Sequence, residues 1–205
     1  KNSGWQRETI FRMLKTFLLP EWQEEEVDRL ENYVLSHGIR PWQYHEPWEF
    51  RTYRDLDAPA PALSEKEQAE LTEVNAWRTR LTAMLDELAE KWSQSPKSKD
   101  RCRLLYQWMM DKKIPDTLSA MDEKEALRTN LRPHLQVWKK ILSLLDEIVH
   151  TAGDDEISEK NFLSIFEDGL TALTYSTIPP TLDHVTVTGM NRGYAMEAAA
   201  VFIPG

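Results

Sequence analysis

Apolar residues recur at helical spacing through most of this chain, from about residue 6 to residue 173. They return every three or four positions, which places them on one face of an α-helix. Only 7 of the 205 residues are Gly, beside many Leu, Glu, Lys, Arg and Ala, and such a composition is typical of long helices. The sequence therefore predicts a mainly α fold, arranged as a multi-helix bundle.

Proline, glycine and polar turns divide this pattern into successive helices. Pro20 ends the first, Gly38 follows the second, and Ser64-Glu-Lys-Glu67 forms a capping box that opens the third. Pro133 in the first turn and Gly153 past the end mark the sixth. The expected helices cover residues 6–18, 23–37, 64–92, 100–112, 116–129, 133–151 and 158–173.

The same periodicity predicts which side chains face the core. The 8 Trp residues can each bury a large area, and we expect them to join helices. The residues expected to point inward are Ile10, Phe11, Leu14, Phe17 and Leu18; Val27, Leu30, Tyr33 and Val34; Leu71, Val74, Leu81, Leu85, Leu88 and Trp92; Leu104, Leu105, Trp108 and Met109; Leu135, Trp138, Ile141, Leu142, Leu145, Ile148 and Val149; and Phe162, Ile165, Phe166, Leu170 and Leu173.

Residues 39–63 interrupt the pattern, because Pro41, Pro47, Pro59 and Pro61 forbid a regular helix. The segment is rich in aromatic side chains, and so much aromatic surface would not be left in water. The loop either lies folded over the helices or forms a stacking platform for a base or a partner peptide. Its aromatic and histidine residues are Trp42, Tyr44, His45, Trp48, Phe50 and Tyr53.

The last residues, 178–205, contrast with the helical unit of residues 1–177. Pro179 and Pro180 prevent further helix, and residues 185–188 and 199–203 read as two short apolar strands. A domain rarely finishes on a strand whose sheet partners are missing, because its backbone groups would stay unpaired. Since the chain also lacks an initiating Met, we expect it to be a piece of a larger protein.

Composition narrows the classes of function. A net charge of −9 argues against a broad nucleic-acid footprint, because such binding depends on cations that displace counterions from phosphates. The single cysteine, Cys102, excludes a disulfide framework and a thiolate metal cluster. Neither a membrane span nor a signal peptide is indicated, so a cytoplasmic location is expected.

The helical part shows no catalytic constellation. A phosphate-binding Gly-x-x-x-x-Gly-Lys motif and a nucleophile elbow are both missing. The five histidines show no metal-ligand spacing, and the acidic turn at residues 153–158 lacks the ligand pattern of a calcium loop. The carboxylates lie three or four positions from Lys and Arg, as on solvated helix faces. We therefore expect no catalytic residue, metal or cofactor in this part of the chain.

The loop between the two expected strands is a candidate site. It runs from Thr188 to Glu197, at the carboxyl end of a strand, where open sheets with helical crossovers place ligand contacts. Arg192 is the only Lys or Arg after Lys160. It either grips a phosphate or is a solvated side chain on a surface turn.

A series of short motifs also follows a recognisable order along nearly the whole chain, least clearly between residues 65 and 131. The motifs are Phe11-Arg-Met-Leu-Lys-Thr16, Leu18-Leu-Pro20, Leu30-Glu-Asn-Tyr-Val-Leu35, His37-Gly-Ile-Arg40, Glu46-Pro-Trp48, Asp154-Asp-Glu-Ile-Ser158, Ile178-Pro-Pro-Thr-Leu-Asp183 and Ala200-Val-Phe-Ile-Pro-Gly205. Taken together, they resemble the AddB family, which supplies one of the two subunits of the bacterial ATP-dependent helicase/deoxyribonuclease.

The resemblance implies a function for the whole protein. It would form a heterodimer with an AddA-like helicase-nuclease subunit, unwind and degrade broken double-strand DNA ends, and respond to Chi sequences during recombinational DNA repair. Its ATP-binding loop, its Mg²⁺-dependent nuclease carboxylates and the cysteines of a 4Fe-4S cluster would lie outside these residues. Residues 1–177 resemble the helical insertion subdomain of a UvrD-like helicase fold. Residues 178–205 resemble a strand-loop-strand remnant of the second motor-like domain.

The resemblance also gives expectations for the loop. Working helicases of this superfamily carry Thr-x-His and then Lys-Gly-Leu-Glu-Phe before an apolar strand. Here Tyr194 replaces the Lys, Ala195 replaces the Gly and Glu197 keeps the Glu, so these are degenerate motif positions. The changes argue against nucleotide-coupled motor action and favour a scaffold or DNA-path role. The residues expected to contact DNA are Thr188, Asn191 and Arg192.

Two functions are therefore expected from the sequence. The first is a non-catalytic segment of a helicase-exonuclease subunit that carries no complete active site of its own. The alternative is a free-standing helical protein-interaction module that binds a partner peptide through the aromatic loop between Trp42 and Tyr53.

Overall fold

The computed structural model describes residues 5–49, 62–129 and 133–173, and its regular structure in these ranges is helical. This confirms the mainly α prediction. The two expected strands, and with them the division at residue 178, lie outside the described residues. The elements are α1 (Arg7–Leu14), α2 (Glu24–Ser36), the 3₁₀ helix η2 (Pro41–His45), α3 (Glu65–Ser93), α4 (Ser98–Asp111), α5 (Ile114–Thr129), α6 (Pro133–Ala152) and α7 (Glu159–Ala172).

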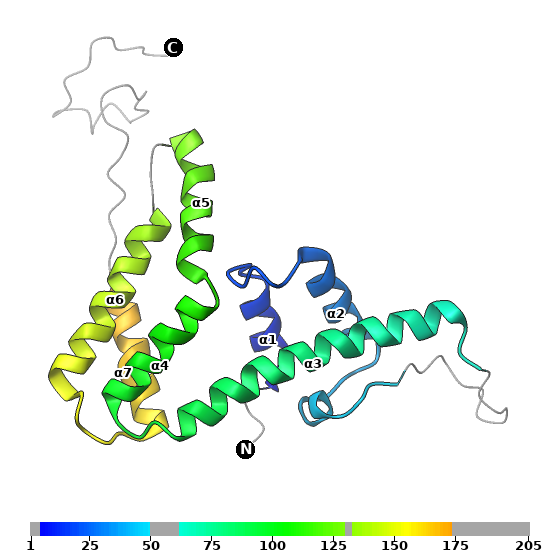
Figure 1. The fold of residues 1–205 in the computed structure, drawn as a ribbon, viewed down its shortest axis with the longest axis horizontal. Helices are drawn as coiled ribbons and strands as arrows, with labels where there is room; N and C mark the ends of the chain where they lie inside the picture. The colour runs from blue at the N-terminus through cyan, green and yellow to red at the C-terminus, as the bar shows by residue number, and fades with distance from the viewer. Residues whose placement is uncertain (1–4, 50–61, 130–132, 174–205) are drawn as a thin grey trace, which may run out of the picture.

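Helix α3 is the longest element and connects two groups of helices (Figure 1). The first group consists of α1, α2 and η2, with α2 and η2 packed on α3 and α1 packed on α2. The second group, α4 to α7, gathers at the carboxyl end of α3. Within it, α6 packs against α4, α5 and α7, so α6 is the central helix of this group.

The larger hydrophobic core passes from the first group into the second. The four residues predicted to face inward from α2 are all buried, which confirms its apolar stripe. They share one core with Ile10 of α1, Leu81 of α3, Ile114 of α5 and Trp138 of α6. A smaller core lies under α7, around Phe162. The buried members of this smaller core are Cys102, Leu144, Leu145, Ile148 and Phe162.

Local sequence signals explain where the helices begin. The Ser64 hydroxyl accepts a hydrogen bond from the Glu67 amide at 3.3 Å, and the Ser64 amide donates to the Glu67 carboxylate at 2.8 Å. The predicted capping box is therefore confirmed. Three glutamates occupy the first turn of α2, where the helix dipole favours negative charge.

Helix α6 begins against a carboxylate from its neighbour. Asp122 of α5 is 1% exposed, and it accepts hydrogen bonds from the amides of His134 at 3.0 Å and Leu135 at 2.8 Å. The His134 ring Nδ1 lies 2.8 Å from the same carboxylate. Amides in the first turn of a helix have no partner within the helix, so Asp122 supplies the missing acceptor from another element.

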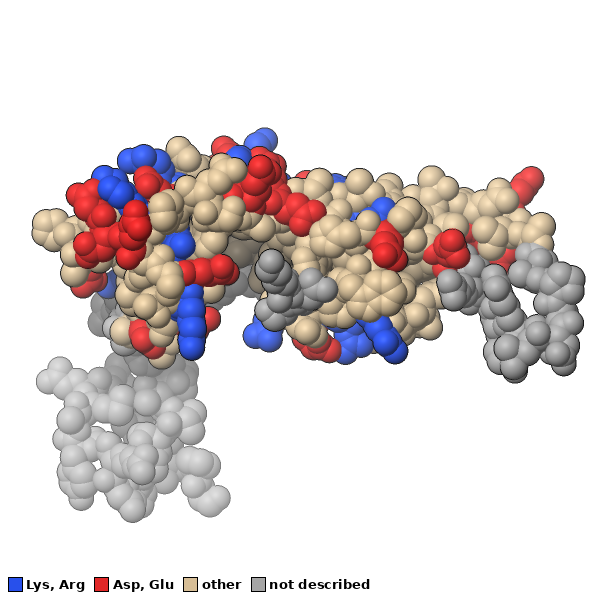
Figure 2. All heavy atoms as spheres, turned by 90° about the horizontal axis from the view of Figure 1, so that it is seen from below, with Lys and Arg blue, Asp and Glu red and all other residues tan. Residues whose placement is uncertain are grey.

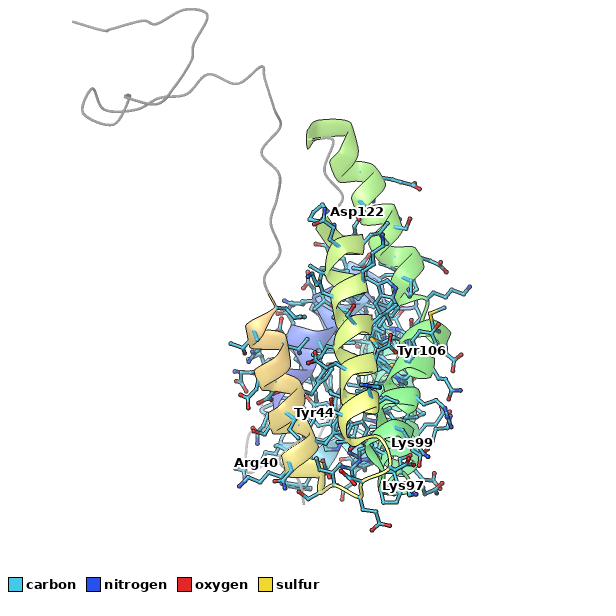
Figure 3. All side chains as sticks on the ribbon, turned by 90° about the vertical axis from the view of Figure 1, so that its left-hand side faces the viewer. Arg40, Tyr44, Lys97, Lys99, Tyr106 and Asp122 are labelled. Atoms are coloured by element: carbon cyan, nitrogen blue, oxygen red, sulfur yellow. The ribbon has the colours of Figure 1, made fainter. Side chains whose placement is uncertain are left out.

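The turn between α3 and α4 is joined to the turn between α6 and α7. The backbone between α3 and α4 pairs with that between α6 and α7 through an antiparallel bridge from Lys97 to Glu156. Arg101, 7% exposed, donates to the carbonyls of Ser95 and Ile157, each at 2.8 Å. Its guanidinium also lies 5.3 Å from the ring centroid of Trp92. Figure 3 shows Lys97 and Lys99 at this end of the helices and Asp122 at the other.

The first helix is shorter than predicted. The sequence places its end near Leu18, but α1 ends at Leu14. Phe17 adopts a φ of 52°, in the left-handed region that a helix cannot include. The Thr16 hydroxyl donates to the Met13 carbonyl at 2.7 Å, which gives the chain an alternative to continued helix.

Predicted burial is wrong at several positions of the second group. Val149, Ile165 and Leu170 are exposed although their spacing predicts a core position. In α4 the buried residues are Ser98, Arg101 and Cys102, whereas the predicted Leu104, Leu105, Trp108 and Met109 are only half-buried. The first turn of α4 is covered because the Ser98 and Lys99 amides donate to the α6–α7 turn, whereas Leu105, Trp108 and Met109 pack at the edges of the two cores.

Candidate functional site

The aromatic loop is fixed to α3 by hydrogen bonds. Asn75 of α3 accepts from the Trp48 amide at 2.8 Å and donates to the Trp48 carbonyl at 2.9 Å. Arg78 donates to the Tyr44 carbonyl at 2.9 Å and to the Asn75 side chain at 3.1 Å. Burial lowers the pKa of Arg78. These bonds fix residues 44–48 of the loop on α3.

Burial decides between the two arrangements expected for the loop. Tyr44 and Trp48 are buried in the larger core, with ring centroids 5.5 Å apart, so these two lie folded over the helices. Trp42 differs, because 51% of it is exposed. His45 is also exposed and its Nε2 lies 3.1 Å from the carboxylate of Asp86. Phe50 and Tyr53 lie outside the described residues.

Two hollows share Ser36 in their lining, and Trp42 lines the first of them; we call the two together the Trp42 groove. One, of about 540 Å³, lies between the carboxyl end of α2 and η2. The other, of about 620 Å³, lies along α2 toward α3. Ser36 lines both, so the two hollows meet at this residue. The first is lined by Ser36, His37, Ile39, Trp42, Gln43, Glu46, Pro47, Trp48 and Glu49, and the second by Arg29, Asn32, Tyr33, Leu35, Ser36 and Glu70.

The floor of the groove is a stack of aromatic rings. Tyr33 lies between His37 and Trp48, with ring centroids 4.2 Å and 5.5 Å away. Burial raises the pKa of the Tyr33 hydroxyl to about 12, with a smaller contribution from the carboxylates of Glu70 and Glu49. The tyrosine is therefore a neutral, rigid part of the wall at physiological pH.

Charge around the groove is mainly negative. Among the lining residues that the structure describes, Glu46, Glu49 and Glu70 are acidic and Arg29 is the one Lys or Arg. Arg29 is engaged elsewhere, since its guanidinium pairs with Glu73 and lies 4.9 Å from the ring centroid of Trp77. The carboxyl end of α2 faces the same space, and its last turn has no basic residue. A helix carboxyl end carries partial negative charge, so the groove favours a cation.

Sequence reasoning missed part of this site. Leu35 is 49% exposed and lines the groove, although it was not among the inward-facing residues of α2. The sequence could have indicated Leu35, because a leucine one position outside the apolar stripe of a helix is expected to be an exposed apolar residue. Glu70 comes from α3, and its place in the groove depends on how α2 and α3 pack.

The other candidate residues cannot be placed. Thr188, Asn191, Arg192, Tyr194, Ala195 and Glu197 lie outside the described residues. Nowhere in residues 5–49, 62–129 and 133–173 do three or more His, Cys, Asp or Glu side chains gather in a way that could hold a metal ion. Within these same ranges, every helix is too short or too polar to span a bilayer.

Basic and acidic side chains are mixed on the surface. Figure 2 shows Lys and Arg lying among Asp and Glu, and the described side chains on that face form no continuous basic track. Several are paired across elements, such as Lys112 with Glu21 at 2.8 Å and Arg80 with Glu26 at 2.7 Å. These cations therefore support the fold and are not gathered for phosphate binding.

Known proteins match nearly the whole chain, although no family model does. Over 98% of its length the chain is 36% identical to a protein of Pelotomaculum thermopropionicum and 38% identical to one of Heliobacterium modesticaldum. A protein of Geobacillus thermodenitrificans is 32% identical over the same share. All three are named as the AddB subunit of an ATP-dependent helicase/deoxyribonuclease. The chain matches a segment of AddB.

The resemblance that the ordered motifs indicated is therefore confirmed. The chain spans 17% or 18% of the length of these AddB proteins. The match covers both helical groups, so the Trp42 groove lies within the AddB-like sequence.

Proposed function

We propose that this chain is a helical segment of the AddB subunit of a heterodimeric ATP-dependent helicase/exonuclease that processes double-strand DNA breaks. The observation that carries this is the match to AddB over 98% of the chain at 36% identity. The whole protein would pair with an AddA-like subunit in the cytoplasm, act in recombinational repair and respond to Chi sequences. Mg²⁺ and a 4Fe-4S cluster would be bound elsewhere in that protein.

We assign the segment a non-catalytic scaffold role along the DNA path. In support, three of its buried polar or charged side chains have structural tasks. Asp122 holds the start of α6, Arg101 joins two turns and Arg78 fixes the aromatic loop. The net charge of −9 also disfavours an extensive DNA track, so any DNA contact is local.

Local DNA contact is assigned to the loop at residues 188–197. Thr188, Asn191 and Arg192 would touch DNA, and Arg192 would contact a phosphate. Tyr194, Ala195 and Glu197 occupy degenerate helicase-motif positions, and the missing Lys and Gly argue against nucleotide-coupled motor action by this lobe.

The test is Arg192→Ala in the full heterodimer. We expect weaker binding to duplex ends, by about threefold to tenfold at low salt, and a weaker Chi response, because one phosphate contact is lost. The control is Arg103→Ala, an exposed arginine of α4. Unchanged DNA affinity and Chi response in Arg192→Ala would remove the DNA-contact assignment.

A second candidate is a helical protein-interaction module, and the exposed Trp42 beside a groove favours it. Co-purification separates the two candidates. Stable recovery of an AddA-like subunit with the full-length protein supports the helicase-nuclease assignment. Recovery of unrelated partners and no such subunit supports the module.

A further inference from the structure

Each hollow of the Trp42 groove has an exposed apolar side chain in its lining, Trp42 in the first and Leu35 in the second. Leu35 is 49% exposed and Trp42 is 51% exposed, and Ser36 lies between them in sequence position and lines both hollows. Its neighbours Tyr44 and Trp48 are buried, so the indole of Trp42 is not needed to close the core. Half-exposed tryptophans beside a hollow are frequent energetic centres of protein interfaces.

The groove is also built to stay open. Asn75 and Arg78 hold the loop to α3, and Gly38 at φ 60° turns the chain between α2 and η2. A preformed groove binds without a large ordering cost, since its side chains and backbone are already fixed.

The charged residues that line the groove favour a cationic ligand. Glu46, Glu49 and Glu70 line the groove, and the carboxyl end of α2 adds a partial negative charge. Arg29 pairs with Glu73, so it does not neutralise Glu46 or Glu70. Such a surface disfavours anionic nucleic acid and favours a cationic group.

We infer that the Trp42 groove docks a partner polypeptide that presents an arginine next to an aliphatic residue. The planar guanidinium stacks on the Trp42 indole and pairs with Glu46, while the aliphatic side chain covers Leu35. Arginine suits this site better than lysine because it stacks and binds a carboxylate through two N–H groups at once. The docking is independent of the DNA contact assigned to residues 188–197.

The probe is a displayed library of random 12-residue peptides, panned against the 205-residue chain. We expect enriched peptides to carry Arg beside Leu, Ile or Val. An enriched peptide, labelled with fluorescein, should bind Trp42→Ala about tenfold more weakly and Glu46→Gln about threefold more weakly by anisotropy. Binding should also weaken as salt is raised.

The matched control is Tyr106→Ala, because Tyr106 is an aromatic residue of α4, 42% exposed and outside the groove (Figure 3). It should bind the peptide as the parent chain does. Circular dichroism spectra of all variants should superimpose, since the replaced side chains are outside the cores.

Three outcomes would overturn the inference. The first is enrichment of acidic or uncharged peptides, and the second is equal binding by Trp42→Ala and the parent chain. The third is a concentration-dependent dimer that Trp42→Ala abolishes, which would make the occupant a second copy.

Discussion

At the scale of single residues, Asp122 shows how a buried charge becomes part of a fold. Burial alone would raise the pKa of its carboxyl group. Hydrogen bonds from the amides of Leu135 and His134 and from the His134 ring lower the pKa by more than burial raises it, so the net shift is downward. The ionised form is thus favoured in the folded protein, where it faces the positive end of α6.

Asp122→Ala should lower the free energy of unfolding by about 2 kcal/mol at pH 7, because amides at the start of α6 lose their acceptor. Since the folded-state pKa lies below the ordinary value of 3.8, this contribution is complete above about pH 5 and is lost as pH falls through the folded-state pKa. Urea unfolding at several pH values measures it. The exposed neighbour Glu123 provides the control, Glu123→Ala, and a difference from the parent chain that is unchanged between pH 7 and pH 3 would contradict the assignment.

Arg101 is a second residue whose task depends on distant partners. Arg101→Lys should lower the free energy of unfolding by about 2 kcal/mol, because an ammonium group cannot reach both carbonyls and also stack on Trp92. In the Arg101→Lys variant, hydrogen exchange should also be faster at the Ser98 and Lys99 amides, which donate to the α6–α7 turn. The exposed Arg103→Lys should change neither quantity. Equal protection in both variants would show that the turns are joined by backbone pairing alone.

At the scale of elements, α6 and α7 meet closely at Gly169. A Cβ added there would lie 2.4 Å from Leu144 Cδ1 and 3.2 Å from its Cγ, so the buried leucine would have to move. Alanine gains about 1 kcal/mol over glycine inside a helix, while overpacking a core costs about 1–3 kcal/mol. At this position the cost of overpacking therefore exceeds the gain in helix propensity.

Gly169→Ala should accordingly destabilise the protein by about 1 kcal/mol. In a Leu144→Ala background the obstruction is gone, and the same substitution should stabilise the protein by about 1 kcal/mol through helix propensity. A double-mutant cycle by urea unfolding measures this change of sign. If Gly169→Ala has the same effect in both backgrounds, the close approach does not limit packing.

The helices also show what periodicity can and cannot predict. The stripe of α2 was correct at every expected position because one face of the helix meets α1 and α3 together. For α7 the prediction was correct at Phe162, but Ile165 and Leu170 are exposed. An apolar stripe shows which face of a helix is apolar, but it does not show how much of that face a neighbouring helix covers. Arg101 was missed because its carbonyl partner lies 56 residues away in sequence.

The candidate site was predictable in part for a similar reason. Residues 39–63 have enough aromatic side chains to require burial, and Tyr44 and Trp48 meet that expectation. Which tryptophan stays outside depends on the bonds from Asn75 and Arg78, and no local pattern encodes them. The groove itself needs Glu70 from another helix, so only the packed structure reveals it.

At the scale of the whole molecule, the larger core crosses from the first helical group into the second through Ile114, Leu118 and Trp138. Because the two groups share this core, we expect them to unfold together. Circular dichroism and amide exchange should then report one common transition. Ile114→Ala should lower the stability of α2 and α6 amides alike, by about 2–4 kcal/mol. Separate midpoints for the two groups would contradict the shared core.

Helix α3 has a mechanical consequence for this architecture. At 1.5 Å per residue its 29 residues extend for about 43 Å, with α2 and η2 packed on its middle turns and the second group gathered at its carboxyl end. A tilt of about 5° at one end would displace the other by about 4 Å, roughly the spacing of successive Cα atoms. Any load on the amino-terminal helices would thus reach the α4–α7 end as a rigid displacement rather than fade within the chain.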